Sequence, residues 1–221
     1  MKIIIGSVLF VATMIMSGLV SAEAQPGRDY TLLNEPQPTT GTKIEVLEFF
    51  FYECPHCFHL HPLLAAWEKN IPKDVALSFV PTIFRESTEP LARTYYSLES
   101  MGKIKQLDDE IYQAIHVKNI DLHDASAIAD FVAQHGVDKA KFSDAYGSFA
   151  VQSKVARAKQ MIRSYAIAGT PTLVVDGKYV ITGMGPKDLI RALDEVVAKV
   201  RKERSGKSAD AQSIKPTAKP A

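Results

Sequence analysis

The chain of 221 residues contains only two cysteines, Cys54 and Cys57, and two residues separate them. Two thiols at this spacing can close into a disulfide and open again, with a thiolate acting as the nucleophile in each exchange. Two cysteines are too few to staple a chain of this length with structural disulfides, or to form a zinc site from cysteines alone. The pair therefore indicates reversible thiol–disulfide chemistry.

Histidines around the two cysteines leave a second chemistry open. His56 lies between them, and His59 and His61 follow at short intervals. Thiolate and imidazole groups suit zinc or copper, and Cys57 and His61 would share one face of a helix. A closed zinc site usually takes its second pair of ligands from a separate segment, however. We therefore expect neither a metal nor another cofactor, and the metal content of protein purified without chelator separates the two chemistries.

The elements on either side of the cysteines place them at the start of a helix. An apolar, β-branched and aromatic segment, Ile44–Tyr52, predicts a buried strand, and a second strand is predicted over Val75–Phe84. The residues between have helical spacing, with Pro55 in the first turn, so a parallel β-α-β unit is expected. Free N–H groups at a helix start favour a thiolate. We expect Cys54 to be exposed with a low pKa, and Cys57 to be buried and to resolve the mixed disulfide.

The remainder of the chain has an all-helical middle and a return to strands. Three histidines of the middle region, His116, His123 and His135, lie near the ends of separate predicted helices, so we expect them at the surface without a chemical role. Helices are predicted over residues 91–101, 103–117, 124–134, from 138 onward and over 149–167, followed by a hairpin over 173–182 that turns at Asp176-Gly177 and by an amphipathic helix over 187–200.

The composition excludes a nucleic-acid-binding domain and a disordered chain. Lysine and arginine together number 26 and aspartate and glutamate 25, so no global positive charge is available for nucleic acid. Hydrophobic residues make up 46% of the chain, which is the balance of a folded globular protein.

The two ends differ from the body of the chain. Residues 1–24 resemble a signal peptide: Lys2 precedes an apolar run, and small residues follow that permit cleavage after Ala22 or Ala24. An uncleaved membrane anchor is the alternative, because the apolar run is just long enough to span a bilayer. Residues 204–221 are rich in Ala, Ser, Lys and Pro, and we expect them to form a disordered basic tail.

Several motifs together resemble the DsbA family of periplasmic thiol–disulfide oxidoreductases. Cys54-Pro55-His56-Cys57 follows Glu48-Phe49-Phe50, and Gly169-Thr170-Pro171-Thr172 stands far downstream. The resemblance covers roughly Tyr30 to Val200. It implies an α/β, thioredoxin-like fold with an inserted all-helical domain: residues 25–86 and 159–203 in the thioredoxin-like domain, and residues 87–158 in the helical insertion.

The resemblance also implies a role for each motif residue. His56 is expected to stabilise the Cys54 thiolate, and Glu48, an acid on a buried strand, to have a raised pKa and to accept the Cys57 proton. Pro171 matches a cis-proline that faces the dithiol. Together with Pro55 and Thr170 it is expected to bind substrate, with the Thr170 backbone pairing with an extended client segment.

The activity implied is donation of the Cys54–Cys57 disulfide to newly exported proteins. The expected partners are reduced client proteins and a quinone-linked membrane reoxidant of the DsbB type, with the enzyme a monomer in the periplasm. Disulfide isomerisation is disfavoured because the chain has no extra dimerisation region, and a reductase role is disfavoured by export and by the Pro-His dipeptide. Glu53 and Thr170 depart from the commonest pattern, so the sequence leaves the redox potential open.

Overall fold

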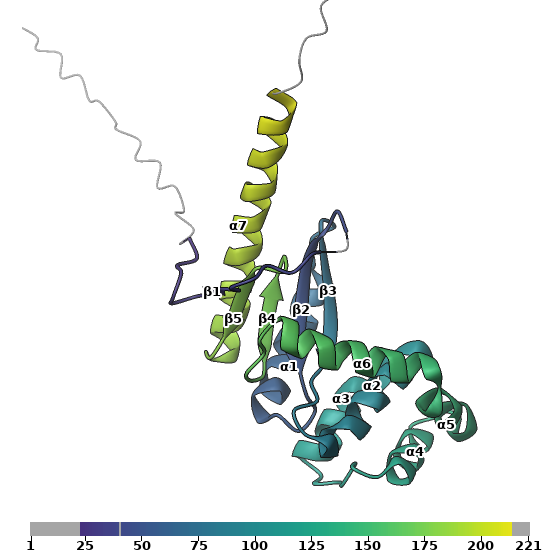
Figure 1. Cartoon of the computed structure of the whole chain (residues 1–221). Coiled ribbons are helices and arrows are strands. Elements are labelled where there is room, and N and C mark those ends of the chain that lie inside the picture. Colours follow the sequence, from purple (N-terminus) through teal and green to yellow (C-terminus); the bar gives the residue numbers. More distant parts are fainter. Residues whose placement is uncertain (1–22, 40, 214–221) are drawn as a thin grey trace, which may run out of the picture.

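The computed structural model describes residues 23–39 and 41–213, with side chains as far as residue 206 (Figure 1). The apolar run of the expected signal segment and the last eight residues lie outside the described part. Within that part, no helix combines the length and the apolar character needed to cross a membrane.

One mixed sheet forms the centre of the described chain. β2 and β3 run parallel, β4 runs antiparallel to β2, and β5 runs antiparallel to β4. The predicted β-α-β unit and hairpin are therefore confirmed, whereas the two-residue edge strand β1 has no counterpart in the sequence-based prediction. The strand order is β1 (Thr31–Leu32), β5 (Tyr179–Thr182), β4 (Thr172–Val175), β2 (Ile44–Phe50) and β3 (Val75–Pro81).

The hairpin between β4 and β5 depends on its turn residues. Asp176 and Gly177 both have positive φ angles, of 56° and 62°, which suit a tight two-residue turn. A Cβ atom at Gly177 would lie 2.2 Å from the carbonyl oxygen of Gln37. Glycine is therefore required both by the turn and by the close approach of the N-terminal segment.

Helices α1 (Pro55–Lys69) and α7 (Pro186–Ser213) pack against each other and against the sheet. Apolar side chains of both helices and of four strands, β2 to β5, meet in one core. This packing fixes the direction of α1 and therefore the position of its first turn. Members of this core include Val46, Leu60, Leu64, Leu173, Leu193 and Val197.

The middle of the chain is helical, as predicted, and gathers beside one end of the sheet (Figure 1). Asp124, Asp138 and Ser148 cap three of these helices by accepting hydrogen bonds from backbone N–H groups in the first turn. A turn of 3₁₀ helix (Glu86–Thr88) precedes α2 (Glu89–Ser100), α3 (Ile104–His116), α4 (Ala125–Gln134), α5 (Lys139–Gly147) and α6 (Phe149–Ser164). The expected domain boundary at residue 158 falls inside α6.

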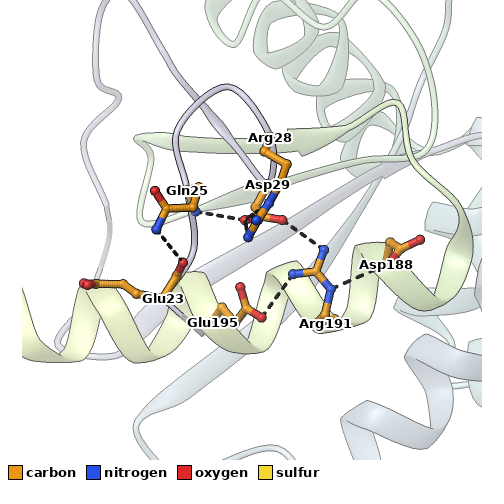
Figure 2. A network of polar contacts seen from close by, with 7 residues as sticks. All are labelled: Glu23, Gln25, Arg28, Asp29, Asp188, Arg191 and Glu195. Atoms are coloured by element: carbon orange, nitrogen blue, oxygen red, sulfur yellow. Dashed lines mark hydrogen bonds and ion pairs between the residues drawn. The ribbon is translucent and has the colours of Figure 1, made fainter. Parts of the chain in front are cut away.

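The N-terminal segment is held against α7 by a polar network around Asp29 (Figure 2). The side chain of Asp29 is fully buried and accepts hydrogen bonds from the backbone of Gln25 and from the guanidinium groups of Arg28 and Arg191. Arg191 also pairs with Glu195 on its own helix. Residues that precede the first strand are thereby fixed to the last helix.

The expectation of disorder from residue 204 is wrong for the first part of the tail, because α7 continues to Ser213. Arg201 pairs with Asp74, and Arg204 pairs with Asp176 and donates to the carbonyl oxygen of Thr42. These contacts anchor the helix on the sheet, and adding residues to a helix already formed costs little. Residues 214–221 of the expected tail lie outside the described part.

Candidate active site

Cys54 stands at the junction of β2 and α1, as the N-cap residue of the helix. The strand brings the chain to the end of the sheet, and Pro55 begins the helix at a position where a missing N–H group is tolerated. The Cys54 Sγ atom accepts a hydrogen bond from the backbone N–H of Cys57 at 3.4 Å. The sulfur therefore occupies the place that a side-chain oxygen takes in an ordinary helix cap.

The surroundings of Cys54 favour its thiolate. The Cys57 thiol, the Thr170 hydroxyl and the backbone N–H groups of Cys57 and His56 stabilise the negative charge, against the opposing effect of burial, and lower the pKa of Cys54 to about 5. The two cysteines are free thiols in the structure, so this is the geometry of the reduced site.

The expectation that Cys54 is exposed is wrong, because both cysteines are buried. Cys54 is 5% exposed and Cys57 fully buried. The loop before β4 covers Cys54, with the Thr170 carbonyl oxygen 3.4 Å from its sulfur, and nothing in the local sequence around Cys54 reveals this contact. Burial raises the pKa of Cys57, and its hydrogen bond to Cys54 and the Glu48 charge raise it further. The predicted contrast in pKa between the two thiols is present, although the predicted contrast in exposure is small.

Glu48 lies on β2, between Phe79 of β3 and Leu173 of β4 in the sheet register. It is 4% exposed, and burial together with the charges of Asp108 and Cys54 raises its pKa to about 8. A carboxyl group with this pKa is protonated at neutral pH and can exchange a proton with a neighbouring thiol. The position and the raised pKa agree with what the resemblance implied.

The loop before β4 brings the distant motif to the dithiol. The Thr170–Pro171 bond is cis, as the resemblance implied, and Thr172 begins the strand directly after it. The Thr172 hydroxyl donates to the Gly169 carbonyl oxygen at 2.8 Å and so closes the loop on itself. Thr170 is half-buried beside Cys54, while Pro171 is buried.

His56 and Pro55 both have exposed side chains at the start of α1. His56 acts on Cys54 through its backbone N–H group, whereas its imidazole ring makes no hydrogen bond within the described part of the chain. The histidines proposed as alternative metal ligands also point to different surroundings: His59 is exposed, and His61 faces Asp108. Among the described residues, no group of three or more metal-ligating side chains comes together.

Two further groups of ionisable side chains adjoin the site, and neither pairing was predicted from the sequence. Asp108 of α3 accepts a hydrogen bond from the Tyr52 hydroxyl at 2.5 Å and lies 3.6 Å from the Nδ1 atom of His61. His123, in the loop before α4, pairs at 3.0 Å with Glu53, the residue that directly precedes Cys54 in the chain.

The expectation that all three histidines of the middle region lie at the surface is wrong for His116. It is half-buried, forms a hydrogen bond of 2.7 Å with the carbonyl oxygen of Tyr52, and stacks on Phe58.

Asp108 could be found in the sequence only through the helical pattern of α3. This pattern places Asp108 beside the buried Leu107, at the edge of the apolar face of the helix.

Comparison with known proteins agrees with this geometry. Residues 64–194 match the DSBA-like thioredoxin domain family. The thiol:disulfide interchange protein DsbA of Burkholderia cepacia is 39% identical over 178 residues, which cover 78% of this chain and 84% of that protein. Its counterpart in Pseudomonas aeruginosa strain PAO1 is 33% identical over 204 residues, covering 88% and 97%.

A solved structure has the same fold. The crystal structure of Pseudomonas aeruginosa DsbA superposes with a TM-score of 0.78 at 34% sequence identity, covering 81% of this chain and 95% of that one. The predicted α/β, thioredoxin-like fold with an inserted helical region is thereby confirmed. The chain belongs to the DSBA-like thioredoxin domain family, and it is a protein disulfide oxidoreductase.

Proposed function

We propose that the enzyme works as a disulfide donor, with Cys54 as the sulfur that clients attack. The observation that carries this proposal is the opposite shift of the two thiols: the pKa of Cys54 is lowered to about 5, while that of the fully buried Cys57 is raised. A thiolate of low pKa is a good leaving group, so a mixed disulfide at Cys54 is resolved quickly in favour of the client disulfide.

The reaction takes place in two exchanges. A client thiolate attacks the Cys54 sulfur, the Cys54–Cys57 bond breaks, and Cys57 leaves as a thiolate that takes a proton from Glu48. A second client thiolate then attacks the client sulfur of the mixed disulfide and releases Cys54 as a stable thiolate. The client dithiol is oxidised, the enzyme disulfide is reduced, and one proton is released in total if Cys57 ends protonated and Cys54 ionised.

Client binding is proposed at the loop before β4. Thr170 is half-buried beside Cys54, and an extended client segment can pair with its backbone while the client sulfur approaches Cys54. Pro55, directly after Cys54, offers an exposed apolar surface at the start of α1. Pro55, Thr170 and Pro171 are proposed as substrate-binding residues; the exposure of Pro55 and the position of Thr170 support this, whereas Pro171 is buried and its proposed part is to hold the loop in place. His56 contributes to the stability of the Cys54 thiolate through its backbone N–H group.

The family supports a proposal for where and with which partners the enzyme acts. We propose that it acts as a monomer in the periplasm on reduced exported proteins, and that a quinone-linked membrane protein of the DsbB type reoxidises it. The thioredoxin-like domain is proposed to comprise residues 25–86 and 159–203, with residues 87–158 as the helical insertion and α6 shared between them. Relatives named as thiol:disulfide interchange proteins support this setting.

For the signal peptide, we propose cleavage after Ala22. Ala24 is 4% exposed and packs in the core that contains α7, and the backbone N–H of Gln25 donates to Asp29 (Figure 2). Cleavage after Ala24 would remove the first of these contacts. Intact mass measurement of protein isolated from the periplasm distinguishes a mature chain that begins at Glu23 from one that begins at Gln25.

Whether the enzyme donates or reduces disulfides is tested by the equilibrium of the Cys54–Cys57 pair with glutathione. A disulfide donor has a potential well above the glutaredoxin range of about −230 to −200 mV, whereas a potential near the thioredoxin value of about −270 mV identifies a reductase. The oxidised enzyme is also mixed with a reduced, unfolded client. Stoichiometric formation of client disulfides supports donation, and a failure to oxidise the client contradicts it.

A further inference from the structure

The proposed reaction requires a proton at a place that bulk water does not reach freely. When the Cys54–Cys57 bond breaks, the negative charge forms on Cys57, which is fully buried and whose pKa burial raises. Glu48 can supply one proton, but its own side chain is only 4% exposed. Each catalytic cycle must therefore return a proton to Glu48 by some route from solvent.

Asp108 is the ionisable group whose charge acts most strongly on Glu48. Its carboxyl group is held at two points: one oxygen accepts the Tyr52 hydroxyl at 2.5 Å, and the other lies 3.6 Å from His61. Tyr52 follows the strand that carries Glu48, and His61 is one helical turn beyond Cys57. The Asp108 carboxyl group thus connects β2, which carries the proton donor Glu48, to α1, which carries the proton acceptor Cys57.

Asp108 and His61 also line a cavity of about 540 Å³, large enough to hold several water molecules. Phe79, the direct neighbour of Glu48 in the sheet, lines the same cavity. Paired residues on neighbouring strands point to the same face of a sheet, so Glu48 is directed to the side of the sheet on which the cavity lies. The charged and titratable groups that face Asp108 or His61 or share this cavity are His61, Glu68 and Lys69 of α1, Glu48 and Tyr52, Tyr95 of α2, and Lys105, Asp109 and Tyr112 of α3.

We propose that Asp108 and His61 are positioning residues that form the proton exit of the active site, passing protons between Glu48 and the water of this cavity. In the donating direction Cys57 takes the Glu48 proton, and Glu48 is reprotonated through Asp108 and His61 by the proton that the client thiol released to water. In the reoxidation of the enzyme the same proton leaves Cys57 in the opposite direction. The inference rests on the proposed roles of Cys57 and Glu48.

The decisive variant is Asp108→Asn, because the amide keeps an oxygen that can accept the Tyr52 hydroxyl, loses the charge, and places an NH2 group that cannot accept a proton on the side of His61. The matched control is Asp109→Asn, which removes the same charge from the next residue, an exposed side chain that lines the same cavity. The titration of Glu48 in the reduced protein is followed by carboxyl-carbon NMR. Oxidation of a short dithiol peptide is followed in single turnovers in water and in deuterium oxide.

In Asp108→Asn we expect the midpoint of the Glu48 titration to fall by about one pH unit, since a like charge is removed. Peptide oxidation at neutral pH should slow by about tenfold, with a larger solvent isotope effect, because proton delivery to Cys57 becomes limiting. Asp109→Asn should change neither. His61→Gln should also slow oxidation, and its effect in combination with Asp108→Asn should be less than additive, since both residues serve one route.

Glu48→Gln separates failure of this inference from failure of the proposed function. If Glu48→Gln oxidises the peptide as fast as the unmodified enzyme, the role assigned to Glu48 is wrong. The proposed proton exit through Asp108 and His61 then has no function. If Glu48→Gln is slow, but Asp108→Asn matches Asp109→Asn in both titration and rate, the exit through Asp108 is wrong and the proposed function stands. Thermal unfolding confirms that each variant is folded.

Discussion

Cys54 and Thr170 are 116 residues apart in the sequence, yet the sulfur of one lies 3.4 Å from the carbonyl oxygen of the other. The contact joins the start of α1 to the loop before β4, on either side of the helical insertion. It places the Thr170 backbone, the proposed pairing site for a client segment, beside the sulfur that clients are proposed to attack. In the proposed mechanism, catalysis and client binding therefore share one surface made from two distant segments.

The first prediction concerns the pH dependence of the reduced enzyme. The pKa of Cys54 is lowered to about 5, from about 8.5 for an unperturbed thiol. The thiolate therefore stabilises the reduced fold fully above the unfolded-state pKa, and this contribution is lost as the pH falls through the folded-state value. The stability of the reduced form relative to the oxidised form should decrease from about pH 8.5 to about pH 5, by at most about 1.4 kcal/mol per pH unit.

Ultraviolet absorbance of the thiolate, titrated against pH, measures the same pKa directly. The Cys54→Ser variant is the control and should lack the transition near pH 5. A midpoint for the unmodified protein above about 7.5, the upper end of the range for activated cysteines, would contradict the electrostatic account of the helix start.

The second prediction concerns which sulfur clients attack. Cys57→Ala should accumulate mixed disulfides with client proteins through Cys54, because the buried thiol that would resolve them is gone. Cys54→Ala should accumulate almost none, since Cys57 is fully buried and its pKa is raised. Non-reducing gels of periplasmic extracts show both outcomes side by side. Equal trapping by the two variants would reverse or abolish the assignment.

Much of the fold could be predicted because its signals are local. The apolar segment of β2, the turn residues Asp176 and Gly177 and the helical spacing of α2 to α6 all act within a few residues. The extension of α7 to Ser213 was missed because its support comes from distant partners. Arg201 and Arg204 pair with Asp74 and Asp176, which lie far upstream in the sequence.

The candidate site was likewise predictable where its signals are local and not where they come from distant segments. Cys54, Cys57 and the motif residues are recognisable from their types and spacing, but the burial of Cys54 depends on a loop more than a hundred residues away. The pairing of Asp108 with His61 joins α3 to α1. Neither residue has a neighbour in the sequence that indicates the other, so only the packing of the two helices reveals the pair.

The third prediction concerns the contact between the helical region and the residue before Cys54. His123 pairs with Asp121 at 2.6 Å and with Glu53 at 3.0 Å, and these partners raise its pKa. Because the folded-state pKa is raised, the stabilisation is fully present below about pH 6.5, the ordinary histidine value, and is lost as the pH rises through the folded-state value. Its size is at most about 1 kcal/mol, since His123 is half exposed and solvent screens the pair.

His123→Gln should therefore lower the free energy of unfolding in mildly acidic buffer and have less effect in alkaline buffer. Denaturant unfolding over a pH series measures the difference. His59→Gln, which changes an exposed histidine of α1, is the control and should show no such trend. An effect of His123→Gln that is independent of pH would mean that the ion pair contributes nothing and that only packing is lost.

The fourth prediction concerns the anchor of the N-terminal segment on α7 (Figure 2). Asp29 is fully buried, and the Arg28 guanidinium and the Gln25 backbone hold the pKa of its carboxyl group well below the usual range. Its stabilising contribution is present above about pH 3.9, the ordinary aspartate value, and is lost as the pH falls through the lower folded-state value.

Asp29→Asn should lower the unfolding temperature by several degrees at neutral pH, because an amide brings its own donors against the two guanidinium groups. Asp188→Asn is the matched control: it removes a charge that faces the same Arg191 from an exposed position, and it should have little effect. Equal unfolding temperatures for the two variants would mean that the N-terminal segment is not held through Asp29.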